Sequence, residues 1–209
     1  IFFFFMAEQA KLVLVGDTNV GKTNLLYAYT GTEFAKEVLD PVPEKREATI
    51  DALDKQVKLT IADTRGSYDF DKLRPLAYPH AGCFLICFSV VNPNSFQNIT
   101  KKWIPELEKY CPRTPFILVG TKTDLRNDDS PVVKKLKENN KQPISKEQGL
   151  QLADEHKTSY WECSALVGEG IQDLFNAATA AAVGTLLYNP NTGWEAVPTR
   201  NNSGCILQQ

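Results

Sequence analysis

The sequence predicts an α/β fold built around a mostly parallel sheet. Segments with the composition of strands alternate with segments that have the spacing of helices, which is the order expected when helices connect parallel strands. Residues 83–91 (CFLICFSVV) and 115–120 (PFILVG) are almost continuously apolar, as in strands buried on both faces. The length of 209 residues suits one domain followed by a tail.

Local signals place the individual elements. Gly31 is expected to end the first helix, Pro105 to kink or restart the longest one, and the sequence SKEQ from Ser145 is a capping box. A short turn between two alternating segments predicts a hairpin. The expected order is a strand at 11–15, a helix ending near residue 30, hairpin strands at 47–53 and 57–63, a strand at 83–91, a helix at 94–110, a strand at 115–120, a short basic helix within 130–140, a helix at 145–156, a strand at 160–165 and a helix at 171–183.

Composition argues against several classes of protein. The formal net charge is −2, and no clustered basic face indicates a nucleic-acid partner. No apolar run approaches the roughly 18–20 residues of a membrane span. Nothing in the composition indicates assembly, and we expect a monomer. The five cysteines lack the spacing of a disulfide framework, and four lie in or beside apolar runs, which predicts buried, reduced thiols: Cys83, Cys87, Cys111 and Cys163.

The two ends of the chain differ from the rest. Residues 1–5 (IFFFF) precede Met6, the only methionine, and lack the basic region and cleavage site of a signal peptide. We interpret Met6 as the natural start and residues 1–5 as extraneous; a short hydrophobic anchor is the alternative. Residues 184–209 are rich in Gly, Asn, Pro and Thr without periodicity, which predicts a flexible tail behind a domain at 6–183.

Residues 16–23 (GDTNVGKT) match the phosphate-loop pattern G-x-x-x-x-G-K-[ST] between a strand and a helix. In this motif backbone N–H groups surround the phosphates, the lysine reaches the β and γ oxygens, and the last hydroxyl ligates Mg²⁺. A glycine-rich turn without a ligand would explain neither Lys22 nor Thr23. The expected phosphate-binding residues are Gly16, Asp17, Thr18, Asn19, Val20, Gly21, Lys22, Thr23 and Asn24.

A second candidate segment, residues 63–67 (DTRGS), follows the strand of the hairpin. An Asp-Thr-x-Gly sequence downstream of a phosphate loop indicates a sensor of metal and phosphate. We expect Asp63 to join Thr23 at the Mg²⁺ ion and Gly66 to lie at the γ-phosphate.

The sequence TKTD, residues 121–124, offers a means of choosing the base. The Asp124 carboxylate can accept both N–H groups on the N1/N2 edge of guanine, an edge that adenine lacks. The sequence CSAL, residues 163–166, adds a loop whose backbone can contact the guanine O6. The residues expected to bind the base are Thr121, Lys122, Asp124, Ser164, Ala165 and Leu166.

Together these motifs resemble the Rho family of Ras-like small GTPases, and its Rac-like members in particular, over about residues 10–183. LRPLAYP, FLICFSVVNPNSF, KWIPELEKYCPRTPFILVGTKTDLR and ECSAL carry the resemblance, and the basic helix at 130–140 corresponds to the extra helix that distinguishes Rho proteins. The resemblance implies a six-stranded, mostly parallel sheet with five main helices plus this insert. It also implies GTP or GDP with Mg²⁺, and Phe34 packed on the edge of the guanine.

The family's partners follow from the same resemblance. They are effector proteins bound through two switches, about residues 38–46 and 63–78, together with exchange factors and a dissociation inhibitor.

The sequence departs from the family at three catalytic positions. Ser67 stands in place of the glutamine that orients the attacking water, and Thr18 in place of a glycine that leaves room for it. Counting without gaps, Pro41 stands at the first-switch threonine and supplies neither a hydroxyl nor an N–H group. Thr49 is the nearest replacement, but it falls in a strand pattern. Arg65 is either a built-in arginine finger or a solvated, partner-facing side chain.

Three functions follow from this pattern. The leading hypothesis is an atypical Rho-like protein that stays bound to nucleotide, with hydrolysis very slow or absent. The second is an ordinary slow GTPase that cycles between GDP and GTP. The third is a nucleotide-free scaffold, against which the intact GDTNVGKT and TKTD motifs argue.

The C-terminal sequence CILQQ bears on location. A prenylation box needs its cysteine fourth from the end, and Gln209 places Cys205 fifth, without a polybasic patch upstream. An unmodified cysteine and a lipidated one remain alternatives, with weak peripheral membrane contact if the lipid is present. We expect a cytoplasmic protein, at the inner face of the plasma membrane if the tail is lipidated.

Overall fold

The computed structural model describes residues 8–31, 45–52, 55–184, 186–189 and 193–196. Phe34, Pro41 and Cys205 lie outside these residues, as do residues 1–5 and most of the first-switch range 38–46. The predictions made for them therefore stay predictions.

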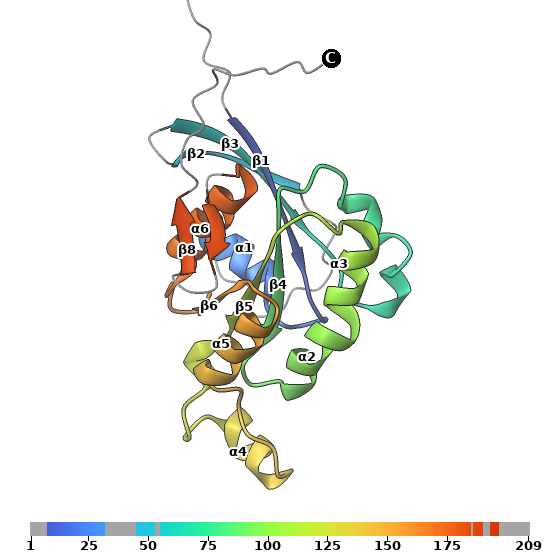
Figure 1. Cartoon of the computed structure of the whole chain (residues 1–209). Coiled ribbons are helices and arrows are strands. Elements are labelled where there is room, and N and C mark those ends of the chain that lie inside the picture. The colour runs from blue at the N-terminus through green and yellow to red at the C-terminus, as the bar shows by residue number, and fades with distance from the viewer. Residues whose placement is uncertain (1–7, 32–44, 53–54, 185, 190–192, 197–209) are drawn as a thin grey trace, which may run out of the picture.

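A twisted sheet forms the centre of the molecule, with strand order β2–β3–β1–β4–β5–β6 (Figure 1). Strands β3, β1, β4, β5 and β6 run parallel, and β2 pairs antiparallel with β3 at the edge. The prediction of a mostly parallel α/β fold with an antiparallel hairpin is confirmed. The strands are β1 (Glu8–Val15), β2 (Lys45–Ala52), β3 (Lys55–Asp63), β4 (Cys83–Ser89), β5 (Phe116–Thr121) and β6 (Ser159–Cys163).

Helices cover both faces of this sheet (Figure 1). Helices α1 and α6 pack on one face, and α2, α3 and α5 on the other, so that the central strands β1 and β4 are buried on both sides. The bounds are α1 (Lys22–Thr30), α2 (Pro93–Asn98), α3 (Ile104–Tyr110), α4 (Pro131–Glu138), α5 (Lys146–Glu155) and α6 (Ile171–Ala182).

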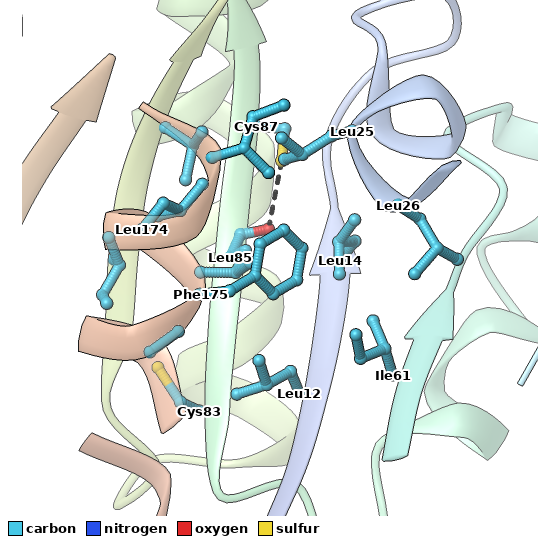
Figure 2. Packing of buried hydrophobic residues seen from close by; sticks show 14 of the residues in the cluster. Leu12, Leu14, Leu25, Leu26, Ile61, Cys83, Leu85, Cys87, Leu174 and Phe175 are labelled. Atoms are coloured by element: carbon cyan, nitrogen blue, oxygen red, sulfur yellow. Dashed lines mark hydrogen bonds between the residues drawn. The ribbon is translucent and has the colours of Figure 1, made fainter. Parts of the chain in front are cut away.

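Alternation along the strands creates two separate apolar cores. In β1, Leu12 and Leu14 belong to the core under α1 and α6, whereas Val13 and Val15 belong to the core under α3 and α5. Figure 2 shows the first core, in which Phe175 of α6 lies among the leucines of the central strands. Packing on both faces leaves the ends of the strands for the polar loops of the site.

The helix-ending and helix-starting signals behave as expected. Gly31 adopts a left-handed conformation, with φ 72°, and its N–H caps α1 through the Tyr27 carbonyl. Ser145 and Gln148 form the capping box of α5. A π-helical turn at Ile99–Trp103 separates α2 from α3, and Pro105 lies in the first turn of α3, so the helix restarts there as predicted.

The cysteines are largely as expected. Cys83, Cys87 and Cys163 are buried free thiols, and Cys111 is partly buried. Figure 2 shows the Cys87 Sγ donating to the Leu85 carbonyl over 3.7 Å, which is a weak bond within the core. Burial raises the pKa of the Cys163 thiol to about 12, so this thiol is protonated at neutral pH.

One part of the structure was not predicted. A hairpin of β7 (Leu186–Asn189) and β8 (Gly193–Ala196) follows α6, within the range interpreted as a flexible tail. Each strand has only four residues, too few for the alternation on which a strand prediction depends. The available signal was the Asn-Pro-Asn-Thr-Gly sequence between the apolar segments, which favours a turn. Within the described part of the chain, no helix has the length and apolarity to cross a membrane.

Candidate nucleotide-binding site

The loop between β1 and α1 approaches its neighbours so closely that it requires glycine. Gly16 has φ 142°, and a Cβ atom there would lie 2.1 Å from the Cys87 carbonyl oxygen of β4. Gly21 has φ 102° and is the N-cap of α1. The loop therefore exposes backbone N–H groups at the first turn of a helix, where anions bind.

Lys22 lies beneath this loop, with only 6% of its surface exposed. Its ammonium donates to the carbonyl oxygens of Gly16 and Asp17, each over 2.8 Å. Burial lowers the pKa of Lys22, and the nearby Asp63 carboxylate opposes this shift. The lysine side chain is thus held at the position that the motif predicts.

Thr23 and Asp63 meet at this point from two different elements. The Thr23 Oγ1 of α1 donates to the Asp63 Oδ2 at the end of β3 over 2.5 Å. A hydroxyl and a carboxylate held side by side are oxygen ligands of the kind that Mg²⁺ takes, usually with several waters. The residues predicted to hold the metal are therefore adjacent, and their chemistry fits the ion.

The segment after Asp63 lies against the phosphate loop. A Cβ on Gly66 would lie 2.2 Å from the Gly16 carbonyl oxygen and 2.5 Å from the Thr18 backbone nitrogen. Only glycine fits this contact without displacing the loop. Its backbone is therefore beside the loop that would hold the phosphates.

The side chains on either side of Gly66, Arg65 and Ser67, contact residues of their own segment. The Ser67 hydroxyl accepts a hydrogen bond from the Asp69 N–H over 3.3 Å and donates to the Asp69 carboxylate over 3.2 Å. It therefore caps a 3₁₀ turn at Tyr68–Phe70. The Arg65 guanidinium lies 4.6 Å from the centre of the Phe70 ring, within its own segment. Thr18 is exposed.

Arg74, which the sequence analysis did not single out, fixes this segment in place. Its fully buried side chain donates to Glu106 of α3 over 2.9 and 2.6 Å, and to the Asp71 carboxylate over 2.6 Å. It also donates to the Arg65 carbonyl over 2.9 Å. Burial alone would lower the pKa of Arg74, but the bonds to Glu106 and Asp71 outweigh it and the net pKa is raised. A charged residue within LRPLAYP was the only available signal, and its partners are distant in sequence.

A pocket lies beside the phosphate loop, where α1 meets the two loops predicted to bind the base, residues 121–124 and 163–166 (the base-binding loops). Ser164 donates its hydroxyl hydrogen to the Asp124 Oδ1 over 2.5 Å, which orients the carboxylate. Ser164 itself is fully buried. The pocket is lined by Gly21, Asn24, Leu25, Thr121, Lys122, Asp124, Leu125, Cys163, Ala165 and Leu166.

Two side chains connect the base-binding loop to the phosphate loop. The Thr121 Oγ1 donates to the Val20 carbonyl over 2.5 Å and is 2.9 Å from the Phe88 carbonyl oxygen. The Lys122 ammonium donates to the Asn19 carbonyl over 2.7 Å. Because both bonds end on backbone, the spacing between the two loops does not depend on the phosphate-loop side chains.

The two base-binding loops are also joined to each other. Arg126 donates to both oxygens of Glu162 over 2.9 and 2.5 Å, and the Tyr160 hydroxyl donates to the same carboxylate over 2.7 Å. Bidentate pairs of this kind fix geometry as well as charge. Arg126 closely follows Asp124 in the chain, and Glu162 closely precedes Ser164, so the ion pair ties one loop to the other.

The first strand of the sheet leads through a glycine-rich loop into a helix, and a buried lysine and a Thr–Asp pair lie beside this loop. This arrangement defines a phosphate-loop nucleotide-binding domain. The family model described as "Ras family" matches residues 11–183, and the chain belongs to that family. It is thus a GTP-binding small GTPase by family, and members of this family bind GTP and GDP with Mg²⁺.

Proposed function

We propose that this protein is a Rho-like signalling protein that binds guanine nucleotide and Mg²⁺, has impaired GTP hydrolysis, and acts by binding effectors. The observation that carries this proposal is that Ser67 differs from the predicted nucleotide-binding groups in what it contacts. Its hydroxyl caps the next turn, while the groups that would hold the nucleotide are in place.

Binding is assigned to four side chains. Lys22 would contact the phosphates, Thr23 and Asp63 would hold Mg²⁺, and Asp124 would accept the two N–H groups of guanine. The ion, when bound, neutralises charge on the phosphates. Burial of Lys22 and the Ser164–Asp124 bond support this assignment, because each holds its group in one orientation.

Impaired hydrolysis is proposed because catalysis in this class depends on positioning a water. Ser67 is too short to reach a water at the γ-phosphate, and its hydroxyl bonds to Asp69. Thr18 adds a branched side chain to the loop. Pro41 lies outside the described residues, so the third loss is proposed from the sequence alone.

The Rho-like assignment is supported by the sequence motifs and by helix α4, which lies within residues 130–140, where the resemblance predicts the Rho insert. This helix is short and basic, with Lys134, Lys135 and Lys137. By analogy with that family, effectors would bind the segment 63–78 and the first switch, with signalling to the actin cytoskeleton or membranes as the outcome. Exchange factors and a dissociation inhibitor are the proposed regulators.

An ordinary slow GTPase is the second candidate function. It is favoured by one observation, the contact of Gly66 with the phosphate loop, which retains the backbone arrangement of a γ-phosphate sensor.

Acid release of nucleotide from protein purified from its native cell, followed by chromatography, distinguishes the candidates. Retained GTP supports the proposal and GDP supports the cycling enzyme. An empty protein that also fails to bind added GDP or GTP would overturn both.

Location is proposed from the tail. We expect a cytoplasmic protein whose attachment to the inner face of the plasma membrane depends on a lipid at Cys205. Intact mass spectrometry of the protein from its native cell tests this. Loss of the last residues with an added isoprenoid mass supports attachment, and a chain that ends in unmodified Gln209 refutes it.

A further inference from the structure

Asp17 is the acidic residue of the phosphate loop. It is the second residue of the GDTNVGKT motif, between Gly16 and Thr18, and would place a carboxylate close to a polyphosphate. Like charges at a few ångströms repel by more than about 1 kcal/mol even in a partly aqueous environment. A phosphate loop with such a residue therefore needs contacts that keep the carboxylate away from the phosphates.

Both oxygens of this carboxylate are bound by side chains from the same helical segment. Asn98, the last residue of α2, donates from Nδ2 to the Asp17 Oδ2 over 2.6 Å. Trp103, in the π-helical turn, donates from Nε1 to the Asp17 Oδ1 over 2.8 Å. Trp103 is fully buried, so its donor has little freedom to move. A π-helical turn often marks a functional position in a helix.

These donors lie on the far side of the sheet from helix α1. Trp103 belongs to the core under α3 and α5, whereas α1, which begins at Lys22, packs on the opposite core. The Asp17 side chain therefore points toward α2 and the π turn, while its backbone carbonyl accepts from Lys22. One residue thus presents its backbone to the phosphate loop's lysine and directs its charge away from it.

We propose that Asn98 and Trp103 are positioning residues for nucleotide binding, which hold the Asp17 carboxylate away from the phosphates. The inference rests on the proposed nucleotide-binding function and adds to it the means by which an acidic phosphate loop accepts a polyphosphate. The inference makes two demands on nucleotide affinity. The loss of affinity caused by removing a donor must depend on the Asp17 charge, and it must be larger for ligands with more phosphates.

A double-mutant cycle tests the first demand. Asn98→Ala should weaken GDP binding about tenfold, because a carboxylate with one fixed oxygen can turn toward the phosphates. In an Asp17→Asn background the same substitution should change affinity less than about twofold. The swapped pair, Asp17→Asn with Asn98→Asp, should bind GDP about as well as the wild type, because the charge then sits on α2.

The second demand is tested with two ligands. The loss caused by Asn98→Ala should be larger for GDP than for GMP, since the base and ribose contacts are the same. Trp103→Phe, which removes only the second donor from the carboxylate, should repeat the pattern. Gln97→Ala, at an exposed neighbouring position, is the control.

Equal losses in the wild-type and Asp17→Asn backgrounds, or for GMP and GDP, would overturn the inference while leaving nucleotide binding intact. A wild-type protein that binds neither ligand would overturn the proposed function itself. Thermal unfolding without nucleotide separates these results from a folding defect, because a merely structural bond would lower stability without a loss of affinity that grows with the number of phosphates.

Discussion

The end of the site proposed to bind the base (the base end) and the end proposed to hold the γ-phosphate (the γ-phosphate end) differ in how their side chains are held. At the base end, Asp124 is oriented by Ser164, and its loop is bonded to the phosphate loop through Thr121 and Lys122. At the γ-phosphate end, the Ser67 hydroxyl bonds within its own turn and Thr18 is exposed. In the proposed function, binding depends on groups that are bonded to one another, whereas turnover depends on the side chains at positions 18 and 67. The second property can be lost without the first.

The largest effect is expected at Lys22 of the phosphate loop. Lys22→Met keeps the apolar stem but removes the charge, and should weaken GTP and GDP binding by about a hundredfold or more, because charge-assisted bonds to phosphate are lost. Isothermal titration measures this directly. Lys101→Met, at an exposed position on the π turn, should leave affinity unchanged. Wild-type affinity in Lys22→Met would show that the nucleotide binds elsewhere.

Asp124→Asn isolates the base end. An amide offers one acceptor where the carboxylate offers two, so guanine nucleotide binding should weaken by about 10- to 100-fold. Xanthine carries an oxygen where guanine carries its amino group, and the new amide can donate to it. Xanthosine diphosphate should therefore bind the variant better than it binds the wild type.

The control for the base end is Asp154→Asn, at an exposed position on α5. It should change neither affinity. Unaltered guanine binding in Asp124→Asn would remove the assignment of this carboxylate to the base.

The motifs at both ends of the site could be predicted from the sequence, because the residues of each motif are contiguous. The phosphate loop, the Asp124 motif and the Ser164 loop each occupy a few adjacent residues, and the strands before them have clear apolar patterns. The contacts that hold them could not be predicted in the same way. Asp17 and Trp103 are 86 residues apart in the chain.

Arg74 illustrates the same limit. Its charge alone predicts a solvated side chain, yet it is buried because Glu106, 32 residues away, neutralises it. The contacts of Asp17 and those of Arg74 form only when the helices pack on the sheet.

Restoring residues at the γ-phosphate end tests whether hydrolysis was lost by substitution. Thr18→Gly with Ser67→Gln should raise single-turnover GTP hydrolysis by about tenfold, toward the order of 10⁻⁴ s⁻¹ typical of Ras with its glutamine. The wild type should stay below that rate and respond little to an activating protein. Asp69→Asn, which weakens the acceptor for Ser67 without adding a glutamine, is the matched control and should not increase the rate.

A wild-type rate that already equals that of the double variant would refute impaired hydrolysis. It would leave the base end of the comparison unaffected, since Asp124 plays no part in the chemistry.

The smallest effect concerns the Arg126–Glu162 pair that joins the two base-binding loops. Burial alone would raise the pKa of Glu162, but the hydrogen bonds from Arg126 and Tyr160 outweigh it, and the net pKa is below the usual 4.5. A carboxyl whose pKa is lowered by folding stabilises the native state above its unfolded pKa, and this contribution is lost as the pH falls through the folded pKa. Glu162→Gln should therefore lower the free energy of unfolding by about 1 kcal/mol at pH 7.

The difference between Glu162→Gln and the wild type should shrink as the pH falls below about 4.5, where the wild-type carboxyl also becomes neutral. Urea unfolding from about pH 3 to pH 7 measures it, with Glu138→Gln at an exposed position of α4 as the control. Because the pair joins the Asp124 and Ser164 loops, guanine nucleotide should also dissociate a few-fold faster from the variant at pH 7. A stability difference that does not depend on pH would show that the lost contribution does not come from the charge of Glu162. The base end would then owe its order to Ser164 and the backbone contacts alone.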